Sequence, residues 1–168
     1  MNIRFSADEI FEVAEKKEQD AAAFYNAAAS HVGYPGARQL LEELASWEEK
    51  HEQIFAGMRA SLTAAEKEET TFDPYDENAQ YLRALADHSV YQRNEDPAAI
   101  VGKQPTFEDV LNIAIGKEKD TVLFYLGIRE LVPEAMGQSR LKDIIEEEKR
   151  HVRILTEQLS KTTSSQKQ

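Results

Sequence analysis

The sequence contains no cysteine among its 168 residues. Disulfides, thiolate zinc sites, iron–sulfur clusters and four-cysteine iron centres are therefore excluded within this chain. Glycine and proline are also scarce, at seven and five residues. Alanine, glutamate, lysine, leucine and glutamine are abundant instead, and all of them favour helices. The composition predicts an all-α protein of a length that suits one domain.

Long apolar segments are lacking as well. None approaches the ~20 residues that a helix needs to cross a bilayer, and the N-terminus has no apolar stretch of a secretory signal. We therefore expect a soluble cytoplasmic protein without a membrane partner. The formal charge of −11 argues against a nucleic-acid partner, because such a surface needs clustered Lys and Arg. Composition leaves open whether the carboxylates cover a solvated surface or lie buried beside cations.

Four long helices are predicted from capping signals and from the helical spacing of apolar residues. They cover residues 6 to about 30, about 37 to 62, 105 to about 131, and about 134 to 159. Ser6 with Glu9 has the spacing of a capping box before the first helix, and Thr106 with Asp109 has the same spacing before the third. The sequence therefore predicts a four-helix bundle made of two helical hairpins.

The two predicted hairpins are joined by a long crossover at about 63–105. A structureless loop of this length is unusual in a compact domain, and the apolar spacing within it predicts one short helix at about 77–91. Residues 161–168 are polar and are predicted to form a disordered tail. The predicted domain is thus a single bundle over residues 1–160, and a long crossover is a known connection in such bundles.

The two halves of the chain repeat one another at a shift of 100 residues. The segment KEQD at 17–20 falls on KEKD at 117–120, FY at 24–25 falls on FY at 124–125, and Glu48 and His51 fall on Glu148 and His151. Related hairpins that face each other would form a bundle with a pseudo-twofold axis.

The repeat contains a pattern of candidate metal ligands. Each hairpin carries one glutamate on its first helix and Glu-x-x-His on its second: Glu18, Glu48 and His51, then Glu118, Glu148 and His151. A spacing of three places Glu and His on one helix face. The first-helix Glu and the Glu-x-x-His lie at similar distances from the turn, so all six side chains are predicted to meet in one layer.

Four glutamates buried together require charge compensation. Four carboxylates, two neutral imidazoles and two divalent cations sum to zero, which favours a dimetal site. Carboxylate and imidazole ligands suit iron or manganese, and zinc also fits. Six protein ligands leave coordination positions for water, oxygen or peroxide.

The remaining polar and aromatic residues divide by their positions. Tyr25 and Tyr125 follow Glu18 and Glu118 by seven residues, so they are candidates for hydrogen bonds to the ligating carboxylates, with core packing as the alternative. The residues interpreted as core are Trp47, Phe24 and Phe124; those interpreted as surface are His31, His88, Glu49, Glu52, Glu146 and Glu147. No catalytic residue is assigned beyond the metal ligands.

These motifs resemble those of the rubrerythrin-like branch of the ferritin-like superfamily. The resemblance rests on Glu18 with Phe24-Tyr25, Glu48 with His51, Glu118 with Phe124-Tyr125, and Glu148 with His151. It implies a ferritin-like bundle with two iron ions that Glu48 and Glu148 bridge. Glu18 and His51 would serve one iron, and Glu118 and His151 the other. It also implies peroxide or dioxygen chemistry and, commonly, a homodimer.

Two features depart from the family pattern. Rubrerythrins typically carry a rubredoxin domain that supplies electrons, and this chain has no cysteine to build one. They also carry a glutamate three residues after the third-helix ligand, where this sequence has Thr121.

Three functional hypotheses follow. The first is a redox protein that reduces peroxide or dioxygen, or oxidises Fe(II), with electrons from a separate partner such as a rubredoxin-type protein. The second is an iron-handling protein without catalysis, and the third is a structural zinc or manganese site.

Overall fold

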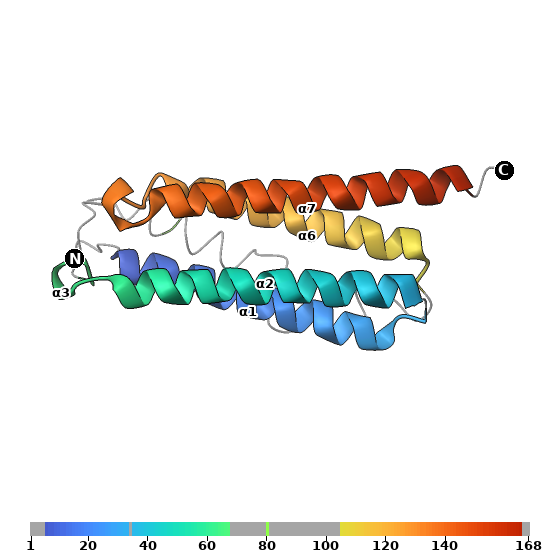
Figure 1. The fold of residues 1–168 in the computed structure, drawn as a ribbon, viewed down its shortest axis with the longest axis horizontal. Coiled ribbons are helices and arrows are strands. Elements are labelled where there is room, and N and C mark those ends of the chain that lie inside the picture. The colour runs from blue at the N-terminus through green and yellow to red at the C-terminus, as the bar shows by residue number, and fades with distance from the viewer. Residues whose placement is uncertain (1–5, 34, 68–79, 81–104, 166–168) are drawn as a thin grey trace.

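The computed structural model describes residues 6–33, 35–67, 80 and 105–165. Its elements are α1 (Ala7–His31), α2 (Pro35–Ser61), α3 (Ala64–Lys67), α6 (Phe107–Arg129), the 3₁₀-helix η1 (Glu134–Met136) and α7 (Gln138–Ser165). Figure 1 shows the four long helices side by side, with α1 paired with α2 and α6 paired with α7. The predicted all-α four-helix bundle of two hairpins is confirmed. No helix in the described ranges is long and apolar enough to span a membrane.

Both hairpins begin with the capping box that the sequence predicts. The Ser6 hydroxyl accepts from the backbone N–H of Glu9 at 3.2 Å, and the Glu9 carboxylate accepts from the backbone N–H of Ser6 at 3.1 Å. Thr106 and Asp109 repeat this exchange at 3.1 and 2.8 Å. These bonds satisfy backbone N–H groups that have no partner within the helix.

We expect Ser6→Ala and Thr106→Ala each to lower the free energy of unfolding by about 1 kcal/mol, because each removes one cap. In a chain of this length that corresponds to a fall in Tm of roughly 2–4 °C. Thermal unfolding followed by circular dichroism checks this prediction. An unchanged Tm in both variants would show that the caps do not limit stability.

The second hairpin turns differently from a simple helix-to-helix loop. The predicted fourth helix, from about 134, is divided at Gly137, whose φ of +108° separates η1 from α7. Such a φ favours glycine. A Cβ at Gly137 would also lie 2.7 Å from Cε of Met58 on α2, so the turn packs closely against the other hairpin.

Helix α7 is longer than the sequence prediction. Residues 161–165 were predicted as part of the tail, but α7 continues to Ser165. Here the hydroxyl groups bond to carbonyls within the helix: Thr162 to Gln158 at 2.9 Å, and Ser164 to Ser160 at 2.8 Å. These polar side chains are thus accommodated in helix instead of ending it. The rest of the predicted tail, 166–168, lies outside the described residues, as does the predicted crossover helix at 77–91 apart from Gln80.

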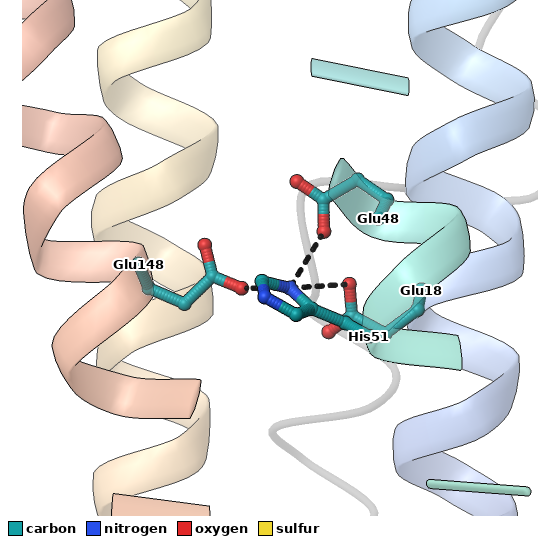
Figure 2. A group of neighbouring side chains, drawn as sticks. All are labelled: Glu18, Glu48, His51 and Glu148. Carbon is teal, nitrogen blue, oxygen red and sulfur yellow. Dashed lines mark ion pairs between the residues drawn. The ribbon is translucent and has the colours of Figure 1, made fainter. Parts of the chain in front are cut away.

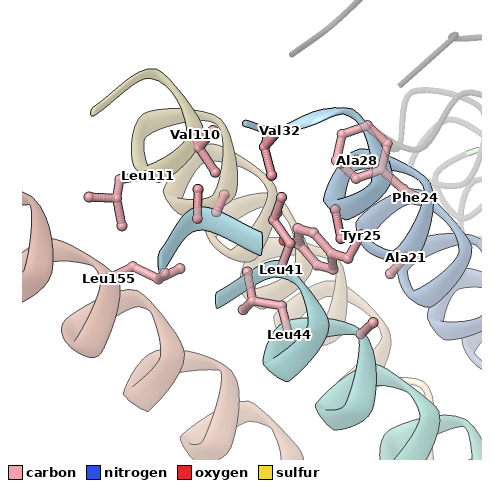
Figure 3. Packing of buried hydrophobic residues seen from close by; sticks show 14 of the residues in the cluster. Ala21, Phe24, Tyr25, Ala28, Val32, Leu41, Leu44, Val110, Leu111 and Leu155 are labelled. Atoms are coloured by element: carbon pink, nitrogen blue, oxygen red, sulfur yellow. The ribbon is translucent and has the colours of Figure 1, made fainter. Parts of the chain in front are cut away.

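The apolar core consists of two clusters, and the buried charged residues fall between them along each long helix. One cluster joins the second half of α1, the first half of α2 and the start of α6, and includes Tyr25, Leu44 and Leu111 (Figure 3). The other includes Phe11, Phe55 and Tyr125. Together the clusters isolate the polar layer from solvent at both ends.

Candidate metal centre

The polar layer of the core contains all six side chains that the sequence analysis predicted as ligands. Glu18 lies on α1, Glu118 on α6, and the two Glu-x-x-His pairs on α2 and α7. All six residues are buried, with exposed fractions of 0% for Glu18, Glu118 and Glu148, 1% for Glu48 and His51, and 5% for His151. Each of the four long helices thus contributes at least one of these buried side chains.

The six side chains form two overlapping groups. In each group the ligand atoms lie within 4.8 Å of one another. The first group is Glu18, Glu48, His51 and Glu148, drawn in Figure 2; the second is Glu48, Glu118, Glu148 and His151. Glu48 and Glu148 belong to both. This is an arrangement in which two carboxylates can lie between two cations.

The layer leaves buried oxygen atoms unsatisfied, and this is the test of whether a metal fits. Both carboxylate oxygens of Glu18 and of Glu48, and Oε2 of Glu118, have no hydrogen-bond partner among the described residues. Buried carboxylates without partners cost several kcal/mol each unless a cation or proton compensates them. Oxygen and imidazole donors of this kind are the ligands that iron, manganese and zinc accept. The residues present therefore fit two metal ions.

The first-helix glutamates have strongly perturbed pKa values. Burial raises the pKa of Glu18 well above its ordinary 4.5, and the nearby Glu48 carboxylate raises it further. Burial and the charge of Glu48 also raise the pKa of Glu118 well above 4.5. Burial therefore favours the protonated form of both carboxyl groups when no metal is bound.

The pKa values of the two histidines and of Glu148 are shifted toward the charged form of each group, whereas those of Glu18 and Glu118 are shifted toward the neutral form. Burial lowers the pKa of His51, but hydrogen bonds to Glu148 and Glu48 outweigh it and raise the pKa to about 11. Burial is likewise outweighed at His151, where Glu118 and Glu148 raise the pKa to about 9. Burial would raise the pKa of Glu148, yet the two histidines hold it well below 4.5. Metal ions would therefore replace protons in this layer.

The two tyrosines differ from the symmetric prediction. Tyr25 donates to Oε1 of Glu118 at 2.6 Å, across the interface to the other hairpin rather than to Glu18 on its own helix. The hydroxyl of Tyr125 is buried and has no hydrogen-bond partner among the described residues; its ring packs 5.2 Å from that of Phe55. Of the two hydroxyls, that of Tyr25 therefore bonds to a predicted ligand, and that of Tyr125 has no such bond within the described part of the chain.

We expect Tyr25→Phe to weaken metal binding at the position that Glu118 serves by roughly threefold, less than the loss of a charged outer neighbour, because it removes one neutral hydrogen bond that orients Glu118. Tyr125→Phe removes an identical hydroxyl that lacks a described partner, so it should leave metal affinity unchanged. Isothermal titration of both metal-free variants with Mn(II) makes the comparison. Equal losses in the two variants would contradict this role of Tyr25.

Two buried lysines were not singled out from the sequence. Lys17 donates to the Thr121 hydroxyl at 2.8 Å, and the ammonium of Lys117 lies 3.9 Å from the ring centroid of Phe24. Their exposed fractions are 6% and 1%. The signal was available, because both lysines stand in the repeated segment directly before the first-helix glutamates.

The structure confirms some of the other interpretations from the sequence and contradicts others. Phe24 and Phe124 are buried as predicted, and His31, Glu49 and Glu146 are exposed as predicted. Glu147 was interpreted as a surface charge, but it contacts Nε2 of His51 at 3.1 Å from the opposite hairpin. Trp47 is half-buried, and its ring stacks on that of His151 with centroids 4.2 Å apart. His88 lies outside the described residues.

Comparison with known proteins agrees with this geometry. Residues 3–59, which carry the ligand pattern of the first hairpin, match the Rubrerythrin family model. The whole chain resembles a Thermotoga maritima protein named as a candidate ferritin-like diiron-carboxylate protein, with a TM-score of 0.64. The two chains are 23% identical, and the match covers 96% of this chain and 99% of that one. No curated protein matches the sequence.

The family model covers the first hairpin, and the structural match at this identity establishes the fold. The family model thus supports the resemblance over the first hairpin, and the chain shares the fold of that ferritin-like structure.

Proposed function

We propose that this protein binds two iron ions in the carboxylate layer and uses them in redox chemistry. The observation that supports the proposal most directly is the pair of ligand groups that share Glu48 and Glu148. In the proposed site, Glu18 and His51 hold one ion, and Glu118 and His151 hold the other. Manganese or zinc would fit the same donors.

Two iron ions, when bound, would supply electrons for the reduction of peroxide or dioxygen, or accept them in the oxidation of Fe(II). The protein's own residues prepare the site for this chemistry. Glu48 and Glu148 would each serve both cations, and the apolar clusters on either side keep bulk water out of the layer. Tyr25 fixes Glu118 by its hydrogen bond.

The electrons are proposed to come from a separate partner, because the chain has no cysteine for an iron centre of the rubredoxin type. A rubredoxin-type protein is the partner that the family resemblance suggests. A homodimer likewise remains a prediction of that resemblance, and a cytoplasmic location remains a prediction from the composition.

Turnover with peroxide tests the proposed redox function. Each peroxide molecule takes two electrons and two protons and yields two waters, so an iron-loaded protein given excess reductant should consume many peroxide molecules per chain. Glu148→Ala should abolish this consumption, and Glu146→Ala, which alters an exposed neighbour, should not. Binding of two irons with peroxide consumption no faster than that of Glu148→Ala would contradict the redox role and leave the metal site standing.

A second function, iron handling without catalysis, is favoured by one specific observation. Position 121, where rubrerythrins carry a further glutamate, holds a threonine whose hydroxyl accepts from Lys17 and donates to the carbonyl of Lys117 at 3.1 Å. Position 121 therefore offers no further carboxylate that could bind a metal ion. Uptake of iron well beyond two ions per chain would support storage, whereas saturation at two ions would count against it. Retained zinc or manganese with no response to Fe(II) and oxygen would support a structural site.

A further inference from the structure

The imidazole of His51 is held from both sides. Its Nδ1 faces the centre, 2.8 Å from Oε1 of Glu148 and 3.7 Å from Oε2 of Glu48. Its Nε2 points the other way and lies 3.1 Å from Oε2 of Glu147. A carboxylate can only accept here, so Nε2 carries the proton that it donates. Nδ1 is then the nitrogen presented to the ligand layer.

The imidazole of His151 has a different outer neighbour. Its Nδ1 also faces the layer, 3.1 Å from Oε2 of Glu148 and 3.6 Å from Oε2 of Glu118. No carboxylate in the described ranges pairs with its Nε2. Instead the indole of Trp47 stacks on the ring, with an angle of 13° between the planes. In the 100-residue repeat, Trp47 is the counterpart of Glu147, so the repeat is broken at the residue behind each histidine.

This difference has a chemical consequence. A carboxylate that accepts from the outer nitrogen fixes the tautomer of a ligating imidazole and makes its inner nitrogen a stronger donor. An indole has an N–H but no acceptor, so Trp47 can hold the ring by stacking but cannot do the same. Loss of such an outer carboxylate typically lowers metal affinity 10- to 100-fold. The side chain of Glu147 is 43% exposed, which places the expected effect at the lower end.

The hydrogen bond of Tyr25 does not cancel the difference. It serves the other metal position, because it ends on Glu118. A neutral hydroxyl that donates to a ligand carboxylate orients that carboxylate but adds no negative charge. Glu147, by contrast, brings a full negative charge beside its histidine.

We propose that the two metal positions are chemically inequivalent and that the position served by His51 binds its ion more tightly because of Glu147. The proposal rests on the proposed dimetal site. It makes Glu147 a positioning residue, which acts on the metal through His51. The position served by His151 and backed by Trp47 is the weaker of the two.

A cycle of variants tests the proposal, with Co(II) as a spectroscopic probe that needs no redox activity. His151→Ala leaves the His51 position complete, and His51→Ala leaves the other. We expect the single complete position of His151→Ala to bind Co(II) about threefold more tightly than that of His51→Ala, because the roughly tenfold gain from Glu147 is partly offset by Tyr25 at the other position. Adding Glu147→Ala should remove this advantage in the His151→Ala background and change nothing in the His51→Ala background. Glu146→Ala, one residue away, exposed and bonded to Lys149, is the matched control.

The outcomes separate the inference from the proposed function. If the unaltered chain binds no Co(II), the dimetal site itself fails. If it binds two ions but Glu147→Ala has no effect, or an equal effect in both backgrounds, the sites are equivalent and the inference is wrong. Circular dichroism checks that each variant folds. Should a histidine variant unfold, comparison of Glu147→Ala with Glu146→Ala in the otherwise unaltered chain gives the same answer: only the former should weaken the first ion to bind.

Discussion

Glu148→Ala is expected to abolish binding of both metal ions, whereas Glu118→Ala is expected to abolish binding of one. Glu148 belongs to both ligand groups and contacts both histidines. Glu118 belongs to one group only. Removal of a shared ligand should lower affinity by more than the ~100-fold upper range seen for outer neighbours of a metal ligand. Equilibrium dialysis against micromolar Mn(II) or Fe(II), with metal analysis of the retained protein, should give about zero and one ion per chain.

Glu146→Ala provides the matched control for Glu148→Ala. It removes an equal charge from α7, but Glu146 is exposed and pairs with Lys149 at 2.7 Å. It should retain two ions per chain. If Glu148→Ala and Glu118→Ala lost the same number of ions, Glu148 would not be shared between two positions.

Removal of metal is expected to make the protein's stability fall as the pH rises. In the folded, metal-free protein, hydrogen bonds to glutamates outweigh burial and raise the histidine pKa values from 6.5. The pKa of His51 is about 11 and that of His151 is about 9. The folded state then binds more protons than the unfolded state, so this stabilisation is complete below about pH 6.5 and is lost as pH rises toward the folded pKa values. The raised pKa values of Glu18 and Glu118 act in the same direction from 4.5 upward. The lowered pKa of Glu148 acts oppositely, but only in acid.

Each proton bound only by the folded state contributes about 1.4 kcal/mol per pH unit. Thermal unfolding of the metal-free protein at pH 6.5, 7.5 and 8.5 should therefore show a falling Tm. The Mn(II)-loaded protein should keep its Tm, because metal binding requires neutral imidazoles and has already released these protons. The gap between the two forms should widen with pH, and metal affinity should rise by about tenfold per pH unit for each proton released.

His51→Gln should flatten the pH dependence of the metal-free protein. His31→Gln changes an exposed histidine and should leave that dependence unaltered. A metal-free Tm that rises between pH 6.5 and 8.5 would show that the histidines are not protonated in the folded layer.

Most of the fold was predictable because the relevant signals are local. The capping boxes at Ser6 and Thr106 and the apolar spacing of the long helices gave element boundaries within a few residues of those observed. The pattern of six candidate ligands was predictable because it occurs twice in the sequence. Antiparallel pairing of the two helices in each hairpin then brings Glu and Glu-x-x-His to the same level along the bundle. Convergence of the two halves then required only that the hairpins face each other.

The features that the sequence did not predict depend on contacts between hairpins. Glu147 is surrounded by charged residues in the sequence, and only the packing of α7 against α2 brings it to His51. Tyr25 was placed on the correct face, but the crossing of the hairpins decides that it reaches Glu118. Gly137, where the predicted fourth helix is divided, has a left-handed φ and lies beside Met58 of the other hairpin. These contacts depend on tertiary packing, which the local sequence pattern does not predict.

If two metal ions occupy the shared carboxylate layer, the metal-free protein should take up two Fe(II) ions per chain. The direct test is an anaerobic calorimetric titration of the metal-free protein with Fe(II). We expect saturation at two ions per chain with release of protons, and we expect Glu148→Ala to lose both. Absence of saturable binding, or saturation at one ion that Glu148→Ala leaves intact, would contradict it.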